Sequence, residues 1–295
     1  MYSIKSKLAS RVVVVGRRLF FHTYFGKTDF AGKVVKLLFK FYSPDLLEPV
    51  SFRTIRLYVD QHDRSYVPGV VGGYYEKLEL DIFSELCKKS SVFFDIGANI
   101  GMYSIVAENS NKKIRSYAFE PTPGNVSLLK KNKELNNMKK IAIIESAVSE
   151  KVGNAKISLG TSGSGTNSLS VDYGGEYLDV KTISVDEFCL KKGIRPDLVK
   201  IDVEGHENYV LKGAVRTIKG SQVTIFIEYI PKMNKEIKRI TKYLAGVSKG
   251  CYVVDDVRGT IEKISSDKLN TNESYNLIFS NNPAHIELIE AFQTI

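Results

Sequence analysis

A group of acids and glycines near residue 95 is the first feature of the sequence that indicates chemistry. The apolar run Val92–Phe94 predicts a buried strand that ends on Asp95, and Gly97 and Gly101 follow at the start of a predicted helix. Glycines remove side chains where a chain turns sharply and a ligand comes close, and helix-start amides point at that ligand. We therefore expect a cofactor-binding loop over residues 95–101.

The spacing within this loop distinguishes between cofactors. A dinucleotide-binding loop needs the pattern G-x-G-x-x-G, whereas residues 95–101 read D-I-G-A-N-I-G. A carboxylate ahead of the glycines repels a pyrophosphate and suits the ammonium or sulfonium of S-adenosylmethionine. A second predicted strand, Ser116–Phe119, ends on Glu120, at the distance along the chain where acids bind ribose hydroxyls. An ordinary strand-to-helix turn is the weaker interpretation once Glu120 is counted.

Two further predicted strands also lead to acids. Leu198–Val203 runs into the segment D-V-E-G-H-E (202–207), and Val223–Ile227 is followed by Glu228. Ligands of open α/β sheets bind at the carboxyl ends of the strands. We therefore expect one rim to carry Asp95, Glu120, Asp202 and Glu228. His206 adjoins these acids, unlike the other histidines, which are His22, His62 and His285.

Alternating strands and helices are predicted to position these residues. The remaining predicted core strands are Ile141–Ile144, Tyr252–Asp255 and Tyr275–Ser280, which brings the total to seven, with the last two as a hairpin. The predicted helices are Tyr75–Cys87, Ile100–Glu108, Pro123 to about Asn136, a short helix capped by Ser184, Lys235–Leu244 and Pro283–Phe292. The pattern predicts a doubly wound α/β fold.

A glycine- and serine-rich stretch, 152–175, interrupts this alternation. It is predicted to lie between a strand at Ala155–Leu159 and a strand at Val180–Ile183. Such an insert is either a flexible linker or a lid over the substrate, because loops on a rigid scaffold often close active sites.

Length, charge and cysteines limit the class of protein. No apolar run approaches the length of a membrane span. Residues 1–50 hold nine lysines and arginines and three acids, which is +6 of the total charge of +9. The rest of the chain is too weakly basic to attract nucleic acid. Three widely spaced cysteines indicate neither disulfides nor zinc, and a reducing cytoplasm is the simplest setting.

We divide the chain into a basic, mostly helical segment, 1–65, and a domain over 66–295. The basic segment is interpreted either as a helical arm packed on the domain or as a surface that contacts anionic lipid at the inner face of the membrane.

Four motifs together resemble the FkbM-type S-adenosylmethionine-dependent methyltransferases. They are F-D-I-G-A-N-I-G (94–101), A-F-E-P (118–121), V-K-T-I-S-V-D-E-F (180–188) and L-V-K-I-D-V-E-G-H-E (198–207). The resemblance spans about 70–285. It implies a class I methyltransferase fold, a Rossmann-like doubly wound seven-stranded sheet whose last strand is antiparallel. It also implies O-methylation of a hydroxyl of a sugar or another small molecule, often in surface glycans, polysaccharides or glycolipids.

The resemblance also implies roles for individual residues. It places the methionine part of the cofactor at Asp95, Gly97, Asn99 and Gly101, and the ribose at Glu120. The adenine is expected near Ser146–Val148, and Asp202 is expected at both the cofactor and the substrate. Glu204 and His206 face the substrate.

Methyl transfer requires a base that takes the proton of the acceptor hydroxyl. By intrinsic pKa His206 is the best candidate, oriented by Asp202 or Glu204. Two alternatives stay open: Asp202 is the base, or Asp202 and Glu228 hold a divalent cation. No metal ligand is otherwise assigned. A catalytically silent cofactor-binding subunit is the competing function, and the chain lacks the Asn-Pro-Pro-Tyr type motif of many nucleic-acid methyltransferases.

Overall fold

The computed structural model describes residues 48–60, 63, 66–160, 167–230, 236–265 and 274–294. The predicted helices of the basic segment, as far as residue 47, lie outside this part. Its described remainder is not helical but forms an antiparallel hairpin of β1 (Val50–Phe52) and β2 (Ile55–Leu57). A short buried helix, α3 (Val67–Gly72), then leads into the domain.

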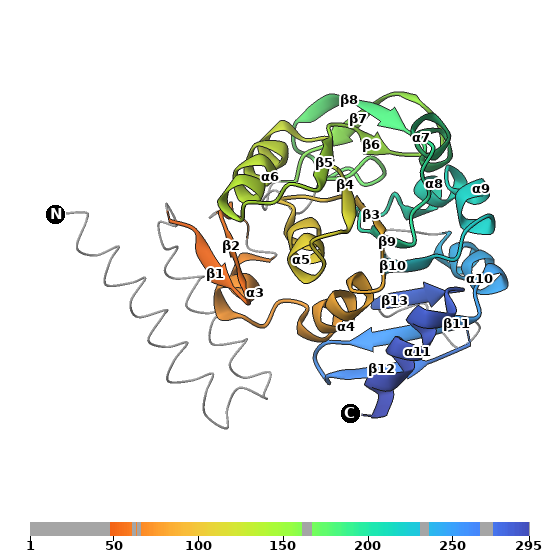
Figure 1. Cartoon of the computed structure of the whole chain (residues 1–295). Helices are drawn as coiled ribbons and strands as arrows, with labels where there is room; N and C mark the ends of the chain where they lie inside the picture. The colour runs from red at the N-terminus through yellow and green to blue at the C-terminus, as the bar shows by residue number, and fades with distance from the viewer. Residues whose placement is uncertain are drawn as a thin grey trace.

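A twisted sheet of eight strands forms the centre of the domain, in the order β12-β11-β13-β10-β9-β3-β4-β5 (Figure 1). Five neighbouring strands are parallel, namely β3 (Val92–Ile96), β4 (Arg115–Phe119), β5 (Ile141–Ile144), β9 (Leu198–Ile201) and β10 (Thr224–Tyr229). The last strand, β13 (Tyr275–Ser280), pairs antiparallel with both β10 and β11 (Gly250–Asp255). The predicted class I methyltransferase sheet with an antiparallel last strand is confirmed.

Three details of the strands differ from the prediction. An eighth strand, β12 (Thr260–Lys263), forms a hairpin with β11. Asp95 and Glu228 were expected to end their strands, but β3 continues through Ile96 and β10 through Tyr229. A buried carboxyl group is tolerated within a strand where it has hydrogen-bond partners, and Asp95 has them in Ser104.

Helices cover both faces of the sheet because its strands are apolar on both sides. One face packs against α4 (Lys77–Cys87), α5 (Met102–Ser110), α6 (Pro123–Leu135) and α11 (Pro283–Ala291). The other packs against α7 (Val185–Lys192), α8 (Glu207–Lys212), α9 (Val215–Lys219) and α10 (Ile237–Val247). Alternate residues of β3 illustrate the two cores: Phe93 belongs to the first and Phe94 to the second.

A smaller sheet, in the order β6-β8-β7, lies beyond the end of β5 in Figure 1. Its strands are β6 (Ala147–Val148), β7 (Gly153–Ser158) and β8 (Tyr177–Ile183), close to the strands predicted around the glycine-rich stretch. Ser168 forms a single bridge with Ser158, so residues 167–173 fold back against the end of the main sheet.

Two further predictions concern absences. All three cysteines are buried and unpaired within the described residues. In the same ranges, no helix is both long and apolar enough to cross a membrane.

Candidate active site

A cavity of about 290 Å3 lies at the carboxyl ends of the parallel strands. The loop after β3, the end of β4, the turn after β9 and the side chain of Glu228 on β10 all contribute to its wall. This is the rim on which open α/β sheets bind their ligands. The structure therefore brings the predicted strand-end acids to one place, apart from Asp95, which lines a smaller adjoining chamber of about 50 Å3.

The glycine loop owes its shape to contacts within the protein. Gly97 has φ of +83°, and a Cβ there would lie 1.8 Å from the carbonyl oxygen of Asp202. Gly101 has φ of +85°, and a Cβ there would lie 2.8 Å from Leu129 of α6. We expected both glycines to make room for a ligand. Only Gly97 lines the cavity, whereas Gly101 makes room for a neighbouring helix.

Glu120 is a buried carboxylate, 4% exposed, at the end of β4. Its Oε2 accepts a hydrogen bond from the backbone of Asn99, and its Oε1 accepts bonds from Thr122 and Asn125. Burial raises its pKa, and these donors oppose the increase. Since Oε1 is fully engaged, Oε2 is the atom that remains open to a ribose hydroxyl.

Asp95 connects the two elements that flank the glycine loop, β3 and α5. Its Oδ2 accepts hydrogen bonds from the backbone amide and the hydroxyl of Ser104, at 2.9 and 2.7 Å. Burial raises its pKa to about 6, partly offset by these bonds. Asp95 thus ties β3 to α5, and its expected contact with the cofactor stays a prediction.

The expected adenine end of the cavity differs by one residue. Ala147 and Val148 line the cavity, but Ser146 does not. Phe119 and Ile157 supply further apolar surface there. The assignment of Ser146 to the cofactor stays a prediction.

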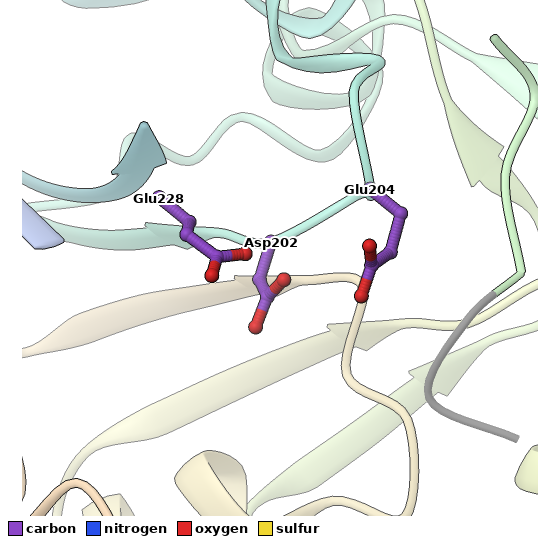
Figure 2. Close-up of side chains that lie close together, drawn as sticks. All are labelled: Asp202, Glu204 and Glu228. Carbon is purple, nitrogen blue, oxygen red and sulfur yellow. The ribbon is translucent and has the colours of Figure 1, made fainter. Parts of the chain in front are cut away.

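Three carboxyl groups converge at the other end of the cavity. Figure 2 shows Asp202, Glu204 and Glu228 pointing toward one another above the strand ends, and one oxygen of each lies within 4.8 Å of the others. Burial raises the pKa of Glu204 to about 8 and that of Glu228 to about 9, and the charge of Asp202 adds to both. Such a cluster either shares protons or binds a cation.

Lys200 supplies the positive charge next to this cluster. It is 6% exposed, and its Nζ lies 3.2 Å from Oδ2 of Asp202 and 3.7 Å from Oε1 of Glu79. The ammonium also lies 4.5 Å from the ring centre of Tyr103. The surrounding carboxylates outweigh the desolvation of Lys200 and raise its pKa, so the lysine is a fixed cation beside Asp202.

His206 lines the cavity but is not oriented by acids. Its Nε2 lies 3.0 Å from the hydroxyl of Ser149, and its Nδ1 lies 2.6 Å from the hydroxyl of Ser170. The expectation that Asp202 or Glu204 orients the ring is therefore wrong. Burial lowers the pKa of His206 to about 4, so the ring is neutral at pH 7 and both nitrogens are occupied. Its role as a base stays a prediction.

Residues 167–173 cover this end of the cavity. Asn167 and Leu169 line it, Ser168 donates a hydrogen bond to the backbone of Glu204, and Tyr173 donates one to the Glu204 side chain at 3.3 Å. Of the two interpretations of the glycine-rich stretch, this position favours a cover over the site.

One part of the cavity wall was not predicted from the sequence, because it comes from a segment outside the four family motifs. Tyr66, Tyr75 and Glu76 precede β3 and line the cavity. Glu76 has φ of +39°, which is uncommon for a residue other than glycine. The turn signals at Val67–Gly73 mark this region, but no local pattern says that it folds over the sheet edge.

The family model for the methyltransferase FkbM domain matches residues 95–265, more than half of the chain. The chain belongs to the FkbM methyltransferase family. Its methyl donor is therefore S-adenosylmethionine, as the glycine loop and Glu120 predict, and its domain is that of a methyl-transferring enzyme.

A characterised relative and two solved structures are similar to this FkbM-family chain. Hexuronic acid methyltransferase AglP of Haloferax volcanii is 28% identical over 143 residues, which is 48% of this chain and 57% of AglP. The chain therefore matches little more than half of that relative's length. The FkbM methyltransferase of Methylobacillus flagellatus has a TM-score of 0.43 at 16% identity, covering 75% of this chain and 55% of its own. The O-methyltransferase TomG of Streptomyces achromogenes has a TM-score of 0.41 at 10% identity, covering 70% and 79%.

The residues of the cavity fit this cofactor. Oδ1 of Asn99 is buried and has no hydrogen-bond partner within the described residues, although Asn99 lines the cavity. An open acceptor beside Oε2 of Glu120 suits ribose hydroxyls, and the acids nearby suit a ligand with a sulfonium and an ammonium. Ala147, Val148 and Phe119 form an apolar surface of the kind that an adenine ring requires.

Proposed function

We propose that this protein methylates a hydroxyl group of a neutral sugar in a glycan, polysaccharide or glycolipid. The observation that carries the proposal is the position of Asp202, which lines the cavity with Gly97 and Asn99 of the cofactor loop and also belongs to the acidic cluster. Asp202 thus lies between the residues expected to bind the cofactor and those expected to bind the acceptor. An acceptor bound next to Glu204 and Glu228 would have its hydroxyl near the methyl group of the cofactor, beside Asp202.

The sugar class is supported by the name of AglP, a hexuronic acid methyltransferase. The acidic walls of this cavity favour an acceptor without the negative charge of a hexuronic acid. Glu76, Glu120, Asp202, Glu204 and Glu228 all line it, and Lys200, the lysine that the described residues place beside them, is already paired. Among the described residues of the wall, the carboxylate of a uronate would meet no unpaired cation. Neutral hydroxyls, in contrast, hydrogen-bond well to carboxyl groups.

The reaction needs alignment and one proton acceptor. Bound S-adenosylmethionine supplies an electrophilic methyl group. Asp202 takes the proton of the acceptor hydroxyl as the new bond forms, and Lys200, 3.2 Å away, holds its carboxylate in place. Glu204 and Glu228 bind neighbouring hydroxyls of the acceptor. The neutral ring of His206 and its serines support the turn that carries Glu204.

The test is a panel of acceptors with labelled S-adenosylmethionine. Neutral sugars and nucleotide sugars are compared with the corresponding uronates, and products are analysed by mass spectrometry. An alkali-stable O-methyl ether on a neutral sugar is the expected product. An alkali-labile methyl ester on a uronate would overturn the neutral-hydroxyl assignment, and cofactor binding without turnover on every glycan fraction of the host would favour a silent subunit.

Two variants and a chelator separate the candidate bases. We expect Asp202→Asn to lose about 10²- to 10⁴-fold in kcat while binding cofactor, and His206→Gln to lose much less. The reverse order would restore His206 as the base. Loss of activity on chelation, recovered with a divalent ion, would instead assign Asp202 and Glu228 as ligands.

A further inference from the structure

Glu76 is the most unusual residue of the wall that precedes the family domain. It occupies the N-cap position of α4 in a left-handed conformation, with φ of 39° and ψ of 50°, and its side chain does not cap the helix. Instead Oε2 lies 2.5 Å from the hydroxyl of Tyr103, and the residue lines the cavity. The carboxyl group is therefore held against the cofactor side of the site.

Tyr103 contacts two carboxyl groups with one proton. Its hydroxyl lies 2.5 Å from Glu76 and 2.6 Å from Oε1 of Glu79. A phenol donates a single hydrogen bond, so two ionised carboxylates cannot both be satisfied, and one of them must carry a proton. Lys200 opposes the rise in the pKa of both acids, but of the two it forms an ion pair with Glu79, at 3.7 Å. We therefore place the proton on Glu76.

The position of Glu76 relative to the cofactor loop indicates which part of the bound cofactor would lie next to its carboxyl group. Tyr103 is in the first turn of α5, directly after the glycine loop, and lines the small chamber beside Asn99. Glu120 directly follows β4, the strand on the opposite side of β3 from β9. With the ribose at Glu120, the methionine end of the cofactor points toward α5. That end carries the ammonium.

We propose that Glu76 binds the ammonium of the methionine moiety of S-adenosylmethionine and releases its proton when the cofactor binds. A cation next to Glu76 stabilises the carboxylate and removes the need for the extra proton. Burial raises the pKa of Glu76 to about 7 in the free protein, so this proton is present below neutral pH. Within the described ranges, the charged and titratable groups that face it are Tyr75, Glu79, Tyr103, Lys200, Asp202 and Glu228.

The test measures binding and needs no acceptor, so it is independent of the proposed sugar substrate. S-adenosylhomocysteine and its desamino analogue, which lacks only the ammonium, are titrated calorimetrically into wild-type and Glu76→Gln protein. We expect Glu76→Gln to weaken S-adenosylhomocysteine about 10- to 100-fold and the desamino analogue less than about 2-fold. Glu76→Gly, which suits the left-handed backbone, should behave in the same way.

A second readout counts protons. In two buffers of different ionisation enthalpy at pH 6, wild type should release close to one proton on binding S-adenosylhomocysteine, and Glu76→Gln should not. Glu85→Gln is the control, since it removes an acid paired with Lys88 on the same helix, and it should match wild type. Equal losses for both ligands, unchanged affinity in both Glu76 variants, or proton release that persists in Glu76→Gln would each overturn the proposal.

Discussion

Glu120 is held by four hydrogen bonds, and these determine how a substitution there acts. Oε1 receives three of them, and Oε2 receives the amide of Asn99. A glutamine that keeps its oxygen toward Thr122 turns its amide group toward the amide of Asn99, which places two donors together. We expect Glu120→Gln to weaken S-adenosylmethionine binding about 5- to 100-fold by calorimetry. An affinity within twofold of wild type would exclude Glu120 from the cofactor site.

The pH dependence of kcat/KM distinguishes between the acids and the histidine as the catalytic base. Burial lowers the pKa of His206 to about 4, so its ring is deprotonated throughout the neutral range. No step near pH 6.5, the usual value for histidine, is therefore expected in the profile. If Glu204 or Glu228 were the base, activity would rise through pH 8–9, where their carboxyl groups ionise. At saturating S-adenosylmethionine, where the proposed proton release from Glu76 is complete, we expect a plateau in kcat/KM for the acceptor across pH 6 to 8.

Local signals fix the ends of several elements. The hydroxyl of Ser184 accepts a hydrogen bond from the amide of Glu187, as the predicted cap requires, and donates one to the Glu187 side chain. Ser184→Ala should lower the free energy of unfolding by about 0.5–2 kcal/mol, measured by denaturant titration. Ser127→Ala, at an exposed position within α6, is the control, and an equal loss there would show that the cap is not the cause.

Elements far apart in the sequence build the cover over the acids. Residues 167–173 reach Glu204 and His206 from a separate strand pair, and the segment before β3 reaches Tyr103. Each element alone is unremarkable in sequence. Their common feature is that both line the cavity at the carboxyl edge of the main sheet.

Buried acids at the site should determine how the free energy of unfolding of the protein depends on pH. Glu204 and Glu228 have pKa values near 8 and 9 in the folded protein, against 4.5 for an ordinary glutamate. The folded state therefore binds more protons than the unfolded state between pH 4.5 and 8–9, and stability falls as pH rises through that range. His206 and His285, with pKa values lowered to about 4, act in the opposite sense below pH 6.5.

The two effects oppose each other below pH 6.5, and only the acids remain above it. We therefore expect the free energy of unfolding of the cofactor-free protein to decrease from pH 6.5 to 9, measured in urea. The double variant Glu204→Gln, Glu228→Gln should flatten this decrease. A stability that rises over the same range would mean that these carboxyl groups are ionised in the folded protein.

The sequence by itself determined the parallel sheet, the cofactor loop and the set of acids at its rim. Those features depend on short-range patterns: apolar strands followed by Asp202 or Glu120, and glycines at positions with positive φ. Parallel strands then bring their carboxyl ends to one edge regardless of the rest.

Only the tertiary structure decided which atoms of those residues remain free. Ser149 and Ser170 occupy the nitrogens of His206 and come from segments 57 and 36 residues away. Glu76 enters the site from before the first core strand. Hydrogen-bond partners and burial set the charge and direction of a side chain, and both depend on contacts between distant segments that no local pattern encodes.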